Sequence, residues 1–143
     1  MKRWQWVVVI VTGLLIVSVL GGGAWYAIGP CGRVTVGDTY GQVKSIVQSW
    51  NSAESSGFFN EAIASSLTTW RNGLNDITAP ACLQPAKSDL LNGMDTVIRA
   101  YQDAAEHPNV AEVYLDFRSG GYTQMKRGGA ELERINGCAP FCQ

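Results

Sequence analysis

The sequence predicts an all-α protein in which a single N-terminal transmembrane helix precedes an antiparallel four-helix bundle. One observation is an uncharged, largely apolar stretch that runs from Trp4 to Gly32. A second is a series of four later segments in which apolar residues recur at spacings of three and four, the helical period. The third is a set of four cysteines that such an N-terminal segment would place outside the cytoplasm, where disulfides form.

Composition narrows the class of protein. The 143 residues suffice for one domain, and a hydrophobic share of 46% excludes a disordered chain. The 11 Lys and Arg against 12 Asp and Glu provide no basic surface for nucleic acid. A single histidine excludes multi-histidine metal sites and bis-histidine haem.

Residues 1–30 are predicted to form a membrane anchor. Residues 6–28 carry no charge and would extend about 34 Å as a helix, enough to cross a hydrocarbon layer of roughly 30 Å. Lys2 and Arg3 precede this stretch, so the positive-inside rule places the N-terminus in the cytoplasm. We therefore expect a single-pass protein of the cell membrane, embedded in the lipid bilayer, with the bulk of the chain extracytoplasmic.

Two alternatives to an anchor stay open. Residues 1–3, 7–20 and 22–24 have the basic, apolar and small-residue character of a cleavable signal peptide, which would leave a secreted domain. A lipoprotein site at Cys31 is disfavoured because Pro30 stands where a small residue is needed.

Residues 31–38 are predicted to be a linker, and residues 39–143 a helical domain. The first helix is expected over 39–55 and the second over 59–77, with turn residues at 55–57 between them. A third is expected to start at Gln84-Pro85, since proline suits a first helical turn, and to stop near Glu106 before His107-Pro108.

The fourth helix is expected to begin at Asn109, which with Glu112 resembles a capping box. Its apolar stripe includes Val113 and Phe117 and then two glycines, Gly121 and Gly128, seven residues apart. Each interior glycine costs about 1 kcal/mol relative to alanine, so either the backbone packs closely against a neighbour there or the helix breaks near residues 119–121. We expect one kinked helix; its continuity through Gly120-Gly121 stays open.

The cysteines test the topology. If the four helices alternate in direction, Cys31, Cys82, Cys138 and Cys142 gather at the end of the bundle near the membrane. We favour pairing Cys82 with Cys138 and Cys31 with Cys142, although spacing alone does not choose and Cys138 and Cys142 can also pair with each other. Zinc and redox uses are disfavoured because C-x-x-C pairs are missing.

No pattern indicates catalysis. Ser65, Ser66, Asp95 and His107 have the residue types of a hydrolase triad, but no nucleophile elbow accompanies them. We therefore predict a protein that is not an enzyme and uses no cofactor. An interaction or structural role is expected instead, as an accessory subunit of a larger membrane complex.

Two groups of residues are candidate contacts. Gly22, in a stretch of small residues, and Phe141, in the C-terminal tail, would meet a membrane-protein partner. As an alternative function, Trp50, Trp70 and Tyr101 would enclose an apolar or aromatic small molecule between helices, although core packing explains the same positions.

A resemblance to a group of known proteins rests on three segments and one tyrosine: Val47–Asn51, Ala79–Ala86, Met94–Ile98 and Tyr101. Over about residues 40–135 the chain resembles small exported or membrane-anchored helical proteins of unknown function from green non-sulfur bacteria. The resemblance implies a helical fold and leaves the function open.

Overall fold

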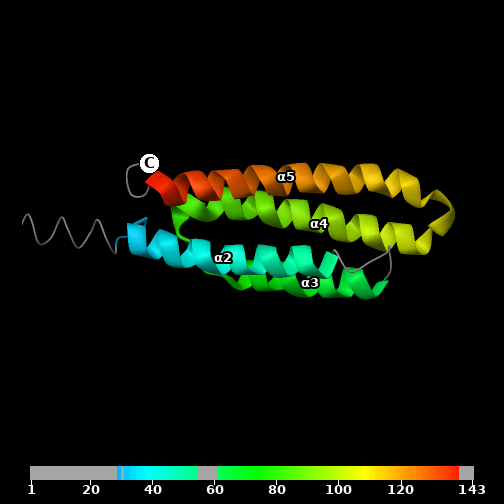
Figure 1. Ribbon diagram of the computed structural model, residues 1–143, viewed down its shortest axis with the longest axis horizontal. Helices are drawn as coiled ribbons and strands as arrows, with labels where there is room; N and C mark the ends of the chain where they lie inside the picture. Colours follow the sequence, from blue (N-terminus) through cyan, green and yellow to red (C-terminus); the bar gives the residue numbers. More distant parts are fainter. Residues whose placement is uncertain (1–28, 30, 55–60, 139–143) are drawn as a thin grey trace, which may run out of the picture.

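A computed structural model describes residues 29, 31–54 and 61–138, and these form four α-helices (Figure 1). They contain no strand, so the all-α prediction is confirmed. The helices are α2 (Arg33–Glu54), α3 (Glu61–Asp76), α4 (Gln84–Glu106) and α5 (Ala111–Cys138), with short 3₁₀ turns η1 (Ala81–Leu83) and η2 (Pro108–Val110) before α4 and α5.

Successive helices run in opposite directions, as expected for an antiparallel bundle (Figure 1). The start of α2, the connection from α3 to α4 and the end of α5 therefore lie at one end of the molecule, called here the Cys31 end. At the opposite end, the hairpin of α4 and α5 extends beyond α2 and α3. Helices α4 and α5 pack most extensively, and α2 meets α5 along a much looser seam.

One continuous hydrophobic core lies between the helices. Its largest fully buried side chains are Trp50, Tyr101, Leu67, Leu74, Leu83, Leu90, Met94, Val36, Val43 and Val97. All four helices contribute to this cluster, including α5 through Met125, Leu132 and Ile135. The described part of the chain is therefore a single packed unit.

The predicted linker at 31–38 is wrong over most of its length, because α2 already begins at Arg33. The reason is that Val36 continues the apolar stripe of α2 one turn toward the N-terminus and is fully buried. Thr39 is also buried, and its hydroxyl donates to the Thr35 carbonyl at 2.9 Å, so this side chain needs no partner outside the helix.

The other helix boundaries agree with the sequence to within a turn. Helix α4 begins at Gln84 with Pro85 in its first turn and ends at Glu106, as predicted. Asn109 lies in the 3₁₀ turn η2 rather than at the predicted cap, so α5 starts two residues later, at Ala111.

Helix α5 is continuous through its glycines, because these let α4 and α5 approach closely. A Cβ atom at Gly121 would lie 2.7 Å from Val97 Cγ2 and 2.8 Å from the Gly93 carbonyl oxygen. A Cβ at Gly128 would lie 2.8 Å from the Ala86 carbonyl oxygen. Of the two alternatives, the structure has close packing at Gly121 and Gly128, and this packing also requires a glycine on α4, Gly93.

A disulfide joins Cys31, just before α2, to Cys82, just before α4. The pairing favoured from the sequence is therefore wrong, since Cys82 is not bonded to Cys138 nor Cys31 to Cys142. Cys138, at the end of α5, also forms a disulfide. The three described cysteines lie at the Cys31 end, as the alternating topology requires, and Cys142 lies outside the described residues.

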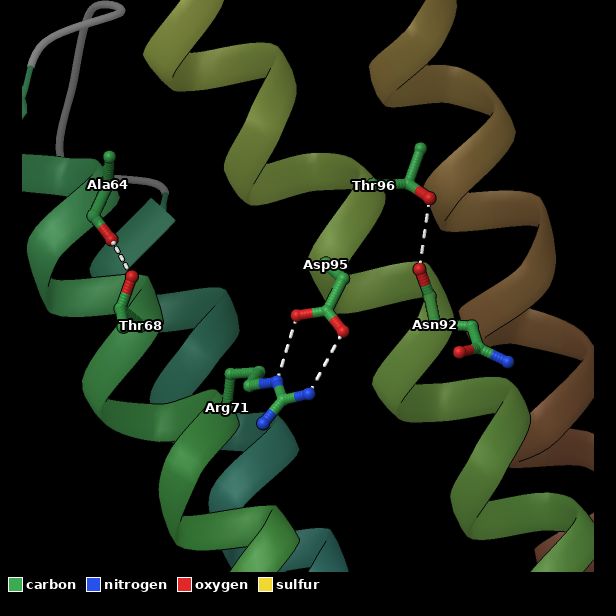
Figure 2. A network of polar contacts seen from close by, with 6 residues as sticks. All are labelled: Ala64, Thr68, Arg71, Asn92, Asp95 and Thr96. Carbon is green, nitrogen blue, oxygen red and sulfur yellow. Dashed lines mark hydrogen bonds and ion pairs between the residues drawn. The ribbon is translucent and has the colours of Figure 1, made fainter.

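Polar contacts fix the seam between α3 and α4. Arg71 of α3 donates two hydrogen bonds to the Asp95 carboxylate of α4, at 2.8 and 3.0 Å (Figure 2). Lys87 of α4 is buried, and its ammonium group donates to the carbonyls of Asn75 and Ile77, both at 2.7 Å. Lys87 therefore supplies the positive charge that the last turn of α3 lacks in its own sequence.

Within residues 29, 31–54 and 61–138, no helix is long and apolar enough to span a membrane. The predicted anchor, residues 1–30, lies outside these residues except for residue 29.

Candidate functional site

The three aromatic residues expected around a ligand lie in or against the hydrophobic core of the described residues. Trp50 and Tyr101 are 0% and 1% exposed within the core, and Trp70 packs against the same cluster from α3. The sequence interpretation that placed a small molecule between them needs a cavity there. The burial of Trp50 and Tyr101 favours core packing at these positions.

A polar network lies where Tyr101 reaches the surface of the core. The Tyr101 hydroxyl donates to Glu54 Oε1 of α2 at 3.1 Å, and Arg118 of α5 donates to the Tyr101 oxygen at 3.3 Å. Arg118 Nη1 also lies 3.9 Å from Glu54 Oε1. The network thus ties α2, α4 and α5 together near the end of α2.

Burial governs the protonation of this network. It raises the pKa of the Glu54 carboxyl, although the Tyr101 hydrogen bond and the Arg118 charge oppose that change. Burial also raises the pKa of the Tyr101 hydroxyl. Neither residue lines a hollow described below, so we assign the network to helix packing rather than to chemistry.

One hollow is a groove along the loose seam between α2 and α5, called here the α2–α5 groove. Its volume is about 490 Å³, within the range of roughly 300–1,000 Å³ typical of small-molecule sites. Its surface is mostly apolar. The lining residues are Tyr40, Val43, Lys44, Val47, Gln48, Asn51, Leu90, Tyr122, Met125, Lys126, Gly129, Leu132 and Glu133.

Two lysines stand on opposite walls of the α2–α5 groove. Lys44 belongs to α2 and Lys126 to α5, and both are exposed. Lys44 Nζ lies 5.7 Å from the centre of the Tyr40 ring, a cation–π distance. Neither lysine forms an ion pair among the described residues.

A second hollow, of about 370 Å³, adjoins the groove on α5. Tyr122 and Lys126 line both hollows, and Arg118, Ser119 and Thr123 complete the second one. Its lining holds two cations and no carboxylate. The Tyr122 hydroxyl is buried and has no hydrogen-bond partner in the described structure, which leaves a polar group unsatisfied beside the groove.

An apolar patch marks the end of the molecule opposite the disulfide. Val113 and Phe117 of α5 are 56% and 60% exposed, although the sequence placed both on the core-facing stripe. They are uncovered because the α4–α5 hairpin extends past the neighbouring helices (Figure 1). The rings of His107, Tyr114 and Phe117 follow one another there, with centres 6.4 Å apart at each step.

Two predicted partner contacts remain. Gly22 and Phe141 lie outside the described residues. Asp95 is held by Arg71 and is not part of a triad. Among the described residues, no group of three or more His, Cys, Asp and Glu side chains is arranged to hold a metal ion.

Sequence reasoning missed the α2–α5 groove. The spacing of Tyr40, Val43 and Val47 predicts a core-facing stripe, because periodicity identifies an apolar face but not how much of it a neighbour covers. Gly129 is the residue of the sequence that marks the groove on α5. It lies beside Gly128 but has open space where a Cβ would be, so it faces the groove instead of α4.

Comparisons with protein-family models, with curated proteins and with solved structures find no match to this chain.

Proposed function

We propose that the protein is a non-enzymatic module, anchored in the cell membrane by residues 1–30, whose helical domain lies outside the cytoplasm and binds a partner protein. The disulfide between Cys31 and Cys82 carries this proposal. Disulfides persist in oxidising compartments, and Cys31 lies at the end of the uncharged N-terminal stretch. It fastens the start of the domain to the base of α4.

The apolar patch of Val113 and Phe117 supports a role in protein contact. With the anchor at the Cys31 end, the patch belongs to the first turns of α5, which begins at the end of the described domain away from the bilayer (Figure 1). Exposed aromatic side chains are enriched at protein interfaces, whereas soluble surfaces seldom gather several of them. In an accessory subunit, the anchor would hold the Cys31 end at the bilayer and the exposed patch would contact a membrane-protein partner.

The experiment is purification of the full chain from its own membranes in mild detergent, with mass spectrometry of the chain and of whatever co-purifies. We expect an intact Met1 and a partner in fixed ratio. A paired variant, Val113→Ser with Phe117→Ser, should release the partner, while Val34→Ser, an equally exposed apolar residue at the other end, should retain it.

Two results would contradict the proposal. A chain that starts near Trp25 would identify a cleaved signal and a secreted domain. A chain that purifies alone, with or without the tip substitutions, would show that it has no stable partner.

The α2–α5 groove favours a second candidate function, the binding of an apolar small molecule. This keeps the class of ligand expected from the sequence but moves its site from Trp50, Trp70 and Tyr101 to the seam between α2 and α5. A ligand that binds there should raise the unfolding temperature of the protein.

A further inference from the structure

We infer that the α2–α5 groove and the adjoining hollow together bind a single-chain amphiphile with a carboxylate headgroup, that is, a free fatty acid. This inference rests on the second candidate function, small-molecule binding in the groove. It adds the chemical class of the ligand and the direction in which the ligand lies.

The shape of the groove suits one extended chain. It follows α2 from Tyr40 to Asn51 and α5 from Glu133 to Tyr122, a length of about 16 Å at about 1.5 Å per residue. Val43, Val47, Leu90, Met125 and Leu132 supply its apolar surface. A long and mostly apolar groove favours an acyl chain over a compact polar metabolite.

The charges place the headgroup at one end. The only carboxylate among the groove's lining residues is Glu133, which lies with Lys44 in the half nearer the Cys31 end, whereas Lys126 lies in the other half and Arg118 in the adjoining hollow. Lys126 forms no ion pair in the described structure, and Arg118 already neutralises Glu54. A carboxylate beside Lys126 would therefore meet a net positive site, while a cationic headgroup would be repelled.

The Tyr122 hydroxyl is a second, independent sign of a ligand. It is a buried donor without an acceptor in the described structure, a condition that costs about 1–3 kcal/mol. Tyr122 lines both hollows, so it lies where the chain of an amphiphile would give way to its headgroup. A carboxylate oxygen at this junction would accept its hydrogen bond after a small shift of the ring.

The test uses the full chain in nanodiscs of uncharged phospholipid, with a dodecanoate that carries a terminal diazirine. After irradiation, mass spectrometry of peptides locates the label. We expect labelling of residues 40–51 and 122–133. Unmodified dodecanoate should compete about five-fold better than dodecanol, as one exposed ion pair allows, and dodecylammonium should compete least.

Two pairs of variants make the result specific. Gly129→Leu should fill the groove and abolish this labelling without disturbing the core, while Gly120→Leu, also in open space but away from the groove, should keep it. Lys126→Gln should remove the preference for dodecanoate over dodecanol. Arg127→Gln, the same loss of charge at a residue that pairs with Asp89, should keep that preference.

The outcomes distinguish the preference for a carboxylate headgroup from small-molecule binding in the groove. If Gly129→Leu abolishes the groove labelling but dodecanol competes as well as dodecanoate, the carboxylate headgroup is overturned. Small-molecule binding in the groove then remains. Peptides 40–51 and 122–133 that remain unlabelled, or a label that Gly129→Leu does not change, would overturn both.

Discussion

Single residues in this protein satisfy backbone groups that helices leave open. Lys87 is the strongest case, because one ammonium group binds two carbonyls at the end of α3 and the side chain is buried by the helices around it. Hydrogen bonds from a charged donor contribute more than neutral ones, and a buried carbonyl left alone is costly.

We expect Lys87→Met to lower the free energy of unfolding by about 2 kcal/mol, since methionine keeps the volume but leaves the Asn75 and Ile77 carbonyls without a donor. Urea denaturation in non-ionic detergent measures the change. Lys126→Met, at an exposed position on α5, should stay within about 0.5 kcal/mol of the wild type. Equal stability of the two variants would show that Lys87 does not cap α3.

Glu54 gives a pH dependence with a definite sign. Burial raises its folded pKa above the usual 4.5, so its favourable contribution to stability is complete below about pH 4.5 and is lost as pH rises through the folded pKa. Arg118 and Tyr101, the groups that face it, reduce this effect without reversing it. Asp89 behaves in the opposite way, because Arg127 lowers its pKa and its contribution is lost as pH falls.

The difference between the wild type and Glu54→Gln isolates the one carboxyl. We expect the wild type to lose unfolding free energy relative to Glu54→Gln as pH rises from 4 to 7, measured by urea denaturation at each pH. A difference that stays constant would indicate that the pKa of Glu54 is the same in both states. A difference that grows in favour of the wild type would show that Arg118 outweighs burial.

At the scale of the helices, glycine position decides how closely α4 and α5 approach. Adjacent glycines on α5 have opposite surroundings: a Cβ at Gly121 would meet backbone and side-chain atoms of α4, and a Cβ at Gly120 would meet nothing within 4 Å. We expect Gly121→Ala to destabilise the protein by about 1–3 kcal/mol through overpacking. Gly120→Ala should stabilise it by up to about 1 kcal/mol through helix propensity.

Thermal and urea unfolding of the two alanine variants test this reversal of sign. Gly128→Ala and Gly129→Ala provide a second pair with the same contrast, since only Gly128 meets α4. Destabilisation by all four substitutions would mean that α5 needs glycine for its own conformation and not for packing.

The helices themselves follow from local sequence, but the relation between them does not. Apolar spacing, Pro85 and His107-Pro108 identify α3 and α4 closely, because these signals act within one or two turns. The start of α2 was missed since β-branched Val34, Thr35 and Val36 resemble a linker until Val36 is seen buried in the core. The exposed tip at Phe117 depends on how far α4 and α5 extend past their neighbours, which periodicity does not report.

For the whole molecule, the cysteines show the same division between local and distant information. Their gathering at one end follows from the number and direction of the helices, and the structure confirms it for Cys31, Cys82 and Cys138. The choice of partner depends on where the Cys31 segment meets the α3–α4 connection in space, which spacing along the chain does not fix.

The disulfide between Cys31 and Cys82 should be a major source of stability for the fold. It spans 51 residues, and closing a loop of that length in the unfolded chain corresponds to about 4 kcal/mol in the chain-entropy model. The link encloses α2 and α3. These helices pack less extensively against their neighbours than α4 and α5 pack against each other. Without it, α2 would depend on its contacts with α3 and on its looser seam with α5.

We therefore expect the paired variant Cys31→Ser with Cys82→Ser to lose about 4 kcal/mol of unfolding free energy, measured by urea denaturation of the full chain in non-ionic detergent. Hydrogen exchange should show the greatest loss of protection in α2, with α4 and α5 less affected, because the glycine contacts of the α4–α5 pair do not involve the disulfide. A variant that keeps its stability would show that helix packing alone holds α2. Equal loss of protection in all four helices would show instead that the described domain unfolds as one cooperative unit.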